Sequence, residues 1–277
     1  MGRPLAILAG LAALTITGAV LFVYSGVYNV AATEQHTAPV YWMLETAMRQ
    51  SVFRRAENIK VPPLTAQATI ERGMRLYHAN CASCHGAPGI APDAFALGMM
   101  PVPANLALTA REWKPAAVYW AVRHGVKMSG MPAWEFRLPD SDLWAMVAFV
   151  AIMPTLSPDA YRDRLRALTT PGSDSNTSPA SGFDGGDAAR GKVALQQYAC
   201  VSCHVIPGVV GANSPVGPSL AGIGSRKYLA GVIPNSTENM IRFLQSPQQL
   251  APGTAMPNLG VAHEYASDIA LFLDALR

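Results

Sequence analysis

The pentapeptide "CASCH" at residues 81–85 decides how this chain is interpreted, and it recurs as "CVSCH" at residues 200–204. The two copies contain all 4 cysteines of the 277-residue chain. Cysteine pairs of this spacing occur in zinc sites, in redox-active dithiols and at sites where a cofactor is covalently attached. The context of each pair distinguishes among these three kinds of site.

A shared zinc site is disfavoured because the two pairs lie roughly 119 residues apart and neither has a second pair of ligands nearby. A redox dithiol would be expected in a βαβ context, which neither copy shows. The informative residue is the histidine after each second cysteine. C-x-x-C-H is the attachment signature of c-type haem, in which the thiols bond to the porphyrin and the imidazole lies beneath the iron. The pattern predicts two covalent haems c, with attachment through Cys81, Cys84, Cys200 and Cys203 and with His85 and His204 as iron ligands.

The two motifs lie in portions of the chain that repeat one pattern. Each portion has a short helical stretch with a glycine before the first cysteine, followed by a loop with "PANL" at 103–106 or "GPSL" at 217–220. A Met-Pro pair and a closing amphipathic helix follow in both. Strand-like alternation is scarce. The fold class is therefore expected to be mostly α with long irregular loops, which need something to organise them.

The N-terminal segment is apolar. Residues 5–28 contain no charged residue, and about 20 such residues are enough to cross a bilayer as a helix. We expect residues 1–30 to be an uncleaved transmembrane anchor, with Arg3 on the cytoplasmic side and the rest of the chain outside. The alternative is a cleaved signal peptide ending near residues 30–32.

Residues 31–65 are expected to form a juxtamembrane connector with a helix from about residue 40 to 55. Tyr41 and Trp42 are placed to contact the membrane interface. This helix lies either on the membrane, against the body of the protein, or on a membrane partner. The sequence leaves these three alternatives open.

A stretch at residues 169–187 is dense in Ser, Gly, Pro, Asn and Asp, so it is expected to be a flexible linker. It separates residues 66–168 from residues 188–277, and each of these portions has the size of one small domain. The anchor, connector and linker together account for the remaining chain.

Both portions resemble class I cytochrome c domains, over about residues 66–165 and 187–277. Together they resemble a membrane-anchored di-haem cytochrome c with two tandem domains. The resemblance implies that an N-terminal helix crosses a C-terminal helix in each domain, with a methionine on the distal side of each haem. It also implies that the carbonyl of Pro103 or Pro218 accepts a hydrogen bond from the ligating histidine and so fixes the imidazole.

The sixth iron ligands are predicted to be Met131 and Met256. Each methionine directly precedes a proline, and the two pairs occur at equivalent places in the two portions. Met128 is the main rival in the first portion and Met240 a weaker rival in the second. The methionines that lie in expected helices are interpreted as core residues that fill irregular gaps; they are Met74, Met146 and Met153.

His124 and His263 are further alternatives as sixth ligands, and Trp134 is expected to pack near the first haem. Histidine and methionine together saturate the iron and leave no position open for oxygen or peroxide. Outer-sphere transfer of single electrons is the chemistry that such a site supports.

The predicted function is that of an electron-transfer protein at the periplasmic face of a bacterial inner membrane. Its electrons would come from a quinol-oxidising complex or a periplasmic dehydrogenase and pass to an acceptor such as a terminal oxidase. A net charge of +3 is too small to indicate nucleic acid as a partner. The chain would act either as a tethered carrier or as a subunit of a respiratory complex, and not as an enzyme itself. The alternative is a di-haem peroxidase-type enzyme, which requires one open haem site.

Overall fold

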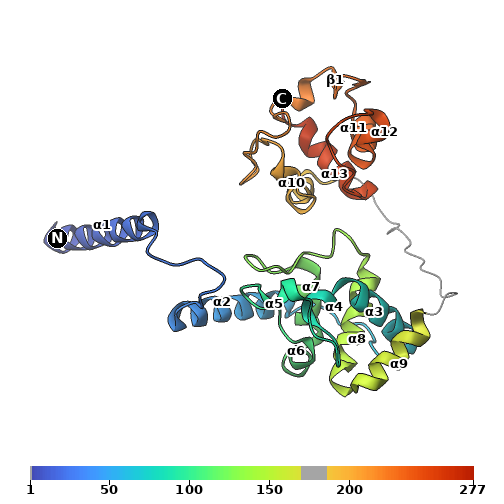
Figure 1. Ribbon diagram of the computed structural model, residues 1–277. Helices are drawn as coiled ribbons and strands as arrows, with labels where there is room; N and C mark the ends of the chain where they lie inside the picture. Colours follow the sequence, from blue (N-terminus) through green and yellow to red (C-terminus); the bar gives the residue numbers. More distant parts are fainter. Residues whose placement is uncertain (1, 170–185) are drawn as a thin grey trace.

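The computed structural model describes residues 2–169 and 186–277, and these are mostly helical (Figure 1). Helix α1, Gly2–Ser25, is set apart from the other helices. Its Pro4–Ser25 stretch has a mean hydropathy of 2.3 and is 0% buried. By length and composition it is able to cross a membrane. Most of the expected linker, residues 170–185, lies outside the described residues.

Helix α2, Ala38–Ala56, is the helix expected in the connector. It packs against α7, Pro115–His124. Buried Val52 contributes to this contact. Arg49 and Arg55 of α2 lie over the rings of Trp113 and Trp120, respectively. The helix thus lies against the body of the protein, and Trp42 near its start is 68% exposed.

We call residues 66–169 the first unit. Its core forms where α3 crosses α8 and includes Tyr77, Met146 and Phe149. The 3-10 helix η1 extends the end of α8. The elements of this unit are α3 Gln67–Asn80, α4 Ala82–His85, α5 Ala94–Leu97, α6 Leu106–Glu112, α7, α8 Asp140–Ile152, η1 Met153–Thr155 and α9 Pro158–Thr169.

We call residues 186–277 the second unit. Its core forms where α10 crosses α13, and the two short strands pair antiparallel with Leu229 opposite Ile233. The elements are α10 Ala188–Gln197, η2 Cys200–Ser202, η3 Ile223–Ser225, β1 Tyr228–Leu229, β2 Ile233–Pro234, α11 Thr237–Gln245, α12 Pro247–Leu250 and α13 His263–Asp274.

The same two features, a close glycine contact and an Arg–Asp ion pair, set the helix crossing in both units. A Cβ added to Gly73 of α3 would lie 1.9 Å from the carbonyl oxygen of Ala145 in α8. A Cβ added to Gly191 of α10 would lie 2.1 Å from the carbonyl oxygen of Asp268 in α13. Only glycine permits backbones to approach so closely, which explains the glycine that precedes each cysteine pair in sequence.

Beside each glycine, an arginine holds a buried aspartate of the crossing helix. Arg72 Nη2 donates to Asp142 Oδ2 at 2.9 Å, and Arg190 Nη2 donates to Asp268 Oδ1 at 2.9 Å. Both aspartates are 0% exposed. A second guanidinium nitrogen bonds each carboxylate as well, so the pairing is bidentate and satisfies the buried charge.

An aspartate near the start of a helix often caps it, but the residue before α8 is Pro139, and no side-chain cap is present there. Asp140 instead accepts hydrogen bonds from Tyr119 and Arg123 of α7. The carboxylate therefore connects α7 and α8.

The two units contact each other through the loop that precedes α8. Ala133 and Phe136 of the first unit are buried in the apolar cluster of the second unit, which includes Tyr198 and Ile269. This contact is not foreseen by the sequence patterns.

Candidate functional site

The first C-x-x-C-H motif forms a tight turn at the end of α3. The backbone N–H groups of Cys84 and His85 both donate to the carbonyl of Cys81, at 3.1 Å and 2.9 Å. Short helix α4 continues this turn. Two thiols and one imidazole are thereby gathered at one end of the helix crossing, as covalent attachment of one cofactor requires.

His85 is oriented by a backbone carbonyl. Its Nδ1 lies 2.7 Å from the carbonyl oxygen of Ala104, which makes Nε2 the nitrogen able to bind iron. The predicted acceptor, Pro103, was wrong by one residue. Any residue can supply such a backbone carbonyl, so a proline is not required. The position of the Ala104 carbonyl is set by the start of α6, where the side chain of Asn105 accepts from the N–H groups of Ala107 and Leu108.

The second motif shows the expected acceptor. Nδ1 of His204 lies 2.7 Å from the carbonyl oxygen of Pro218. The two acceptor residues, Ala104 and Pro218, hold equivalent positions: each stands directly before an Asn or Ser and two residues before a leucine. The side chain of Ser219 accepts from a backbone N–H two residues on, as Asn105 does. A Cβ added to Gly217 would lie 2.6 Å from Cε1 of His204, so glycine leaves the space that the ring occupies.

The environment of the first cysteine in each motif disfavours the two other uses of C-x-x-C. Burial raises the pKa of Cys81 to about 12 and that of Cys200 to about 11. Reactive and zinc-binding cysteines need the thiolate form, which these values disfavour. Within residues 2–169 and 186–277, no group of three or more His, Cys, Asp or Glu side chains is arranged to hold a metal ion.

Burial also acts on the imidazole of the first motif. It lowers the pKa of His85, although the hydrogen bond to the Ala104 carbonyl opposes this shift. The neutral ring is the form that binds metal, so the shift favours the ligand state.

The methionine candidates differ in their surroundings. Met131 is partly buried and packs against the apolar core of the first unit together with Trp134. Its rival Met128 is 96% exposed and lies in the left-handed region at φ 58°. Met256 packs against the core of the second unit, whereas its rival Met240 is a buried core residue of α11. These surroundings favour Met131 and Met256 as ligands, and that assignment remains a proposal.

The expected core methionines are indeed buried: Met74, Met146 and Met153 are 2%, 1% and 3% exposed.

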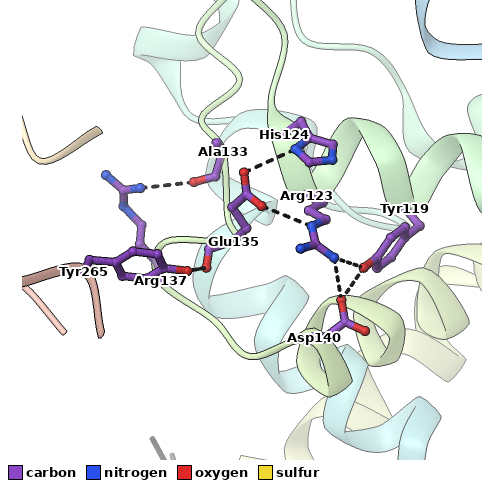
Figure 2. Close-up of polar contacts among 8 residues, drawn as sticks. All are labelled: Tyr119, Arg123, His124, Ala133, Glu135, Arg137, Asp140 and Tyr265. Carbon is purple, nitrogen blue, oxygen red and sulfur yellow. Dashed lines mark hydrogen bonds and ion pairs between the residues drawn. The ribbon is translucent and has the colours of Figure 1, made fainter. Parts of the chain in front are cut away.

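The alternative histidines have other surroundings. His124 lies with its Nδ1 3.2 Å from Glu135 Oε1, and Arg123 Nε donates to the second oxygen of the same carboxylate at 3.1 Å (Figure 2). Burial pushes the pKa of Glu135 up, but the hydrogen bonds from His124 and Arg123 outweigh burial and lower it. His263 is exposed at the start of α13.

The Arg–Asp pairs were missed in the sequence. A signal was present: "RG" occurs in the helix before the first cysteine of each motif, and "SD" followed by Leu or Ile occurs in each closing helix, at residues 141–143 and 267–269. Tyr198 and Tyr265 of the second unit donate hydrogen bonds to carbonyls of the loop at residues 133–137 in the first unit. They carried no such signal, because nothing in the sequence relates them to that loop.

The comparisons with known proteins identify a cytochrome c domain in the first unit. Residues 68–150 match the family described as cytochrome c oxidase, cbb3-type, subunit III. Among curated proteins, cytochrome c oxidase subunit 2 of Alkalihalophilus pseudofirmus is 30% identical over 70 residues. That alignment covers 25% of this chain and 20% of the relative's length. No solved structure matches the chain.

A cytochrome c domain implies covalently bound haem c, and it indicates electron transfer. The donors present in the first unit fit that group: two thiols and an oriented imidazole share one turn, with a partly buried thioether among the candidates.

Proposed function

We propose that the protein is a membrane-anchored electron-transfer protein that carries one covalent haem c in each unit. The observation that carries the proposal is the shared arrangement of the two C-x-x-C-H motifs. In both, Nδ1 of the histidine bonds to a backbone carbonyl at 2.7 Å, which leaves Nε2 free to bind a metal.

When bound, haem iron with one histidine and one methionine ligand supplies one-electron redox chemistry at a raised potential. The residues of the chain hold and orient the group. Cys81 and Cys84 attach it in the first unit, and His85 and Met131 are the proposed ligands. In the second unit the corresponding residues are Cys200, Cys203, His204 and Met256.

The repeated helix crossing supports a second haem. Gly73 with Arg72 in the first unit and Gly191 with Arg190 in the second unit perform the same packing task. This shared packing supports the proposal that the second unit is a second cytochrome c domain around its own C-x-x-C-H motif.

Helix α1 is proposed to be the membrane anchor, with Arg3 on the cytoplasmic side and both units in the periplasm. The packing of α2 on α7 ties the first unit to a helix close to this anchor. The relatives are named as oxidase subunits, which supports a terminal oxidase as the acceptor and a respiratory complex as the setting. A quinol-oxidising complex or periplasmic dehydrogenase is the proposed donor.

Intact mass of the purified full-length protein tests the number of haems. Two covalent haems are expected, and one is expected in a Cys81→Ala/Cys84→Ala variant or in a Cys200→Ala/Cys203→Ala variant. Two haems in either variant, or fewer than two in the parent protein, would contradict the proposal.

The ligands are tested by the weak charge-transfer band of a ferric thioether. Met131→Leu and Met256→Leu should each remove part of this band, whereas the control Met128→Leu should leave it unchanged. Rapid carbon monoxide binding by the reduced parent protein would reveal an open iron position and would refute the electron-carrier proposal.

A further inference from the structure

The segment at residues 133–137, which we call the interunit segment, is held from both sides. Its backbone N–H groups are bound to the first unit. The N–H of Trp134 donates to the carbonyls of Val122 and Arg123, at 3.3 Å and 3.1 Å, and the N–H of Glu135 donates to the Arg123 carbonyl at 3.2 Å. These acceptors are at the end of α7.

The carbonyl groups of the same segment are bound to the second unit. Tyr265 of α13 donates its hydroxyl to the Glu135 carbonyl at 2.7 Å (Figure 2), and the hydroxyl of Tyr198 donates to the Phe136 carbonyl at 2.7 Å. Arg137 donates to the carbonyl of Gln197 at 2.8 Å. The backbone of the segment thus bridges the two units.

Side chains reinforce the bridge. The ring of Phe136 is 5% exposed, and its centroid lies 4.8 Å from that of Tyr265. The guanidinium of Arg137 lies 5.9 Å from the ring centre of Tyr198 and also donates to the Ala133 carbonyl, at 3.0 Å. Aromatic contacts of this kind add to the free energy of apolar burial.

The interunit segment follows a candidate ligand in the chain, and a residue that contacts it, Tyr198, lies near a candidate attachment site. Met131 precedes it by two residues, and the Met131 carbonyl accepts from the Val126 N–H at 3.2 Å. Tyr198 stands two residues before Cys200. Displacing the second unit would remove two hydroxyl partners from the segment and expose Phe136.

We propose that the interunit segment is a docking surface for the second unit of the same chain, and that docking holds Met131 in the position in which it binds iron. The inference rests on the proposed function, because it takes Met131 as the sixth ligand. By thermodynamic linkage, Met131 ligation must favour docking by the same factor by which docking favours ligation.

Hydrogen exchange of the full-length, detergent-solubilised haem protein tests the docking. Tyr265→Phe removes one interunit hydrogen bond and keeps the ring, so the Trp134 and Glu135 amides should exchange about fivefold faster. Phe136→Ala should raise their exchange by roughly tenfold or more, and Phe136→Leu serves if that variant does not accumulate. The control Tyr228→Phe changes a 57% exposed tyrosine of the second unit and should leave both amides unchanged.

Displacement of the thioether by added imidazole tests the coupling. In a Met256→Leu background the band reports the first unit alone, and Tyr265→Phe should lower the imidazole concentration needed to remove it by about fivefold. Unchanged exchange in both interface variants would overturn the docking surface. Faster exchange with unchanged imidazole displacement would overturn the coupling. A band that survives Met131→Leu would instead overturn the ligand assignment, and the exchange results would be unaffected by that failure.

Discussion

Replacing Gly73 with alanine is expected to destabilise the first unit strongly. The new Cβ would lie 1.9 Å from the Ala145 carbonyl oxygen and 2.5 Å from its carbon, both backbone atoms of α8. Helices α3 and α8 would have to separate by roughly 1 Å or more to restore a van der Waals contact. Such overpacking costs about 1–3 kcal/mol.

Separation of the helices also loosens the ion pair beside the glycine, where Arg72 holds the fully buried Asp142. A hydrogen bond to a charged group contributes about 1.5–3 kcal/mol, part of which would be lost. The better helix propensity of alanine returns about 0.5–1 kcal/mol. The free energy of unfolding should therefore fall by about 1–4 kcal/mol, which lowers the melting temperature of a unit of this size by roughly 5–25 °C.

Thermal and urea unfolding, followed by far-UV circular dichroism and by haem absorbance, measure this loss. Gly98→Ala is the matched control. Its new Cβ would meet only the carbonyl oxygen of Phe95 at an ordinary 3.7 Å, so its unfolding free energy should stay within about 0.5 kcal/mol of the parent value. A Gly73→Ala protein as stable as Gly98→Ala would refute the close helix crossing.

Three further outcomes are expected. Asp268→Asn removes a buried carboxylate from its bidentate arginine and should lower the free energy of unfolding in urea by about 2–4 kcal/mol, whereas an unchanged midpoint would contradict the buried pair. Glu135 has a lowered pKa in the folded state, so its stabilisation is present above its unfolded pKa and is lost as the pH falls through the folded pKa. Glu135→Gln should thus be less stable than the parent near neutral pH by up to about 1 kcal/mol, and the two unfolding free energies should converge as the pH falls through the lowered pKa of Glu135. Gly217→Ala places a Cβ 2.6 Å from the ring of His204 and should disturb absorbance of the haem proposed for the second unit while leaving that of the first unit intact, and an unaltered spectrum would argue against that ring position.

The helical elements follow from local patterns and were largely predictable. The closing helix expected in the second portion corresponds to α13, His263–Asp274, and the helix expected at 40–55 corresponds to α2, Ala38–Ala56. Helix ends were less predictable, because Asp140 bonds to α7 and does not cap α8. A helix depends on residues three and four apart, so sequence periodicity is enough to indicate it.

In the candidate site, too, features set by neighbouring residues were predictable, whereas those set by distant parts of the chain were not. Attachment of haem needs only the five residues of "CASCH", so its chemistry is readable in the linear chain. The acceptor for His85 was misplaced at Pro103 because α6 sets the position of the Ala104 carbonyl, and a proline is not required there. The partial burial of Met131 and the exposure of Met128 also depend on how the loop that carries them folds back onto the core.

Local sequence therefore established the helices, the cysteine–histidine motifs and their duplication. Only the folded chain joined Arg72 to Asp142, 70 residues away, and Tyr265 to the Glu135 carbonyl, 130 residues away. The physical reason is that a helix or an attachment motif is specified by neighbours along the chain. A buried ion pair or an interunit contact is specified by which distant surfaces the apolar cores bring together, and no short pattern contains that information.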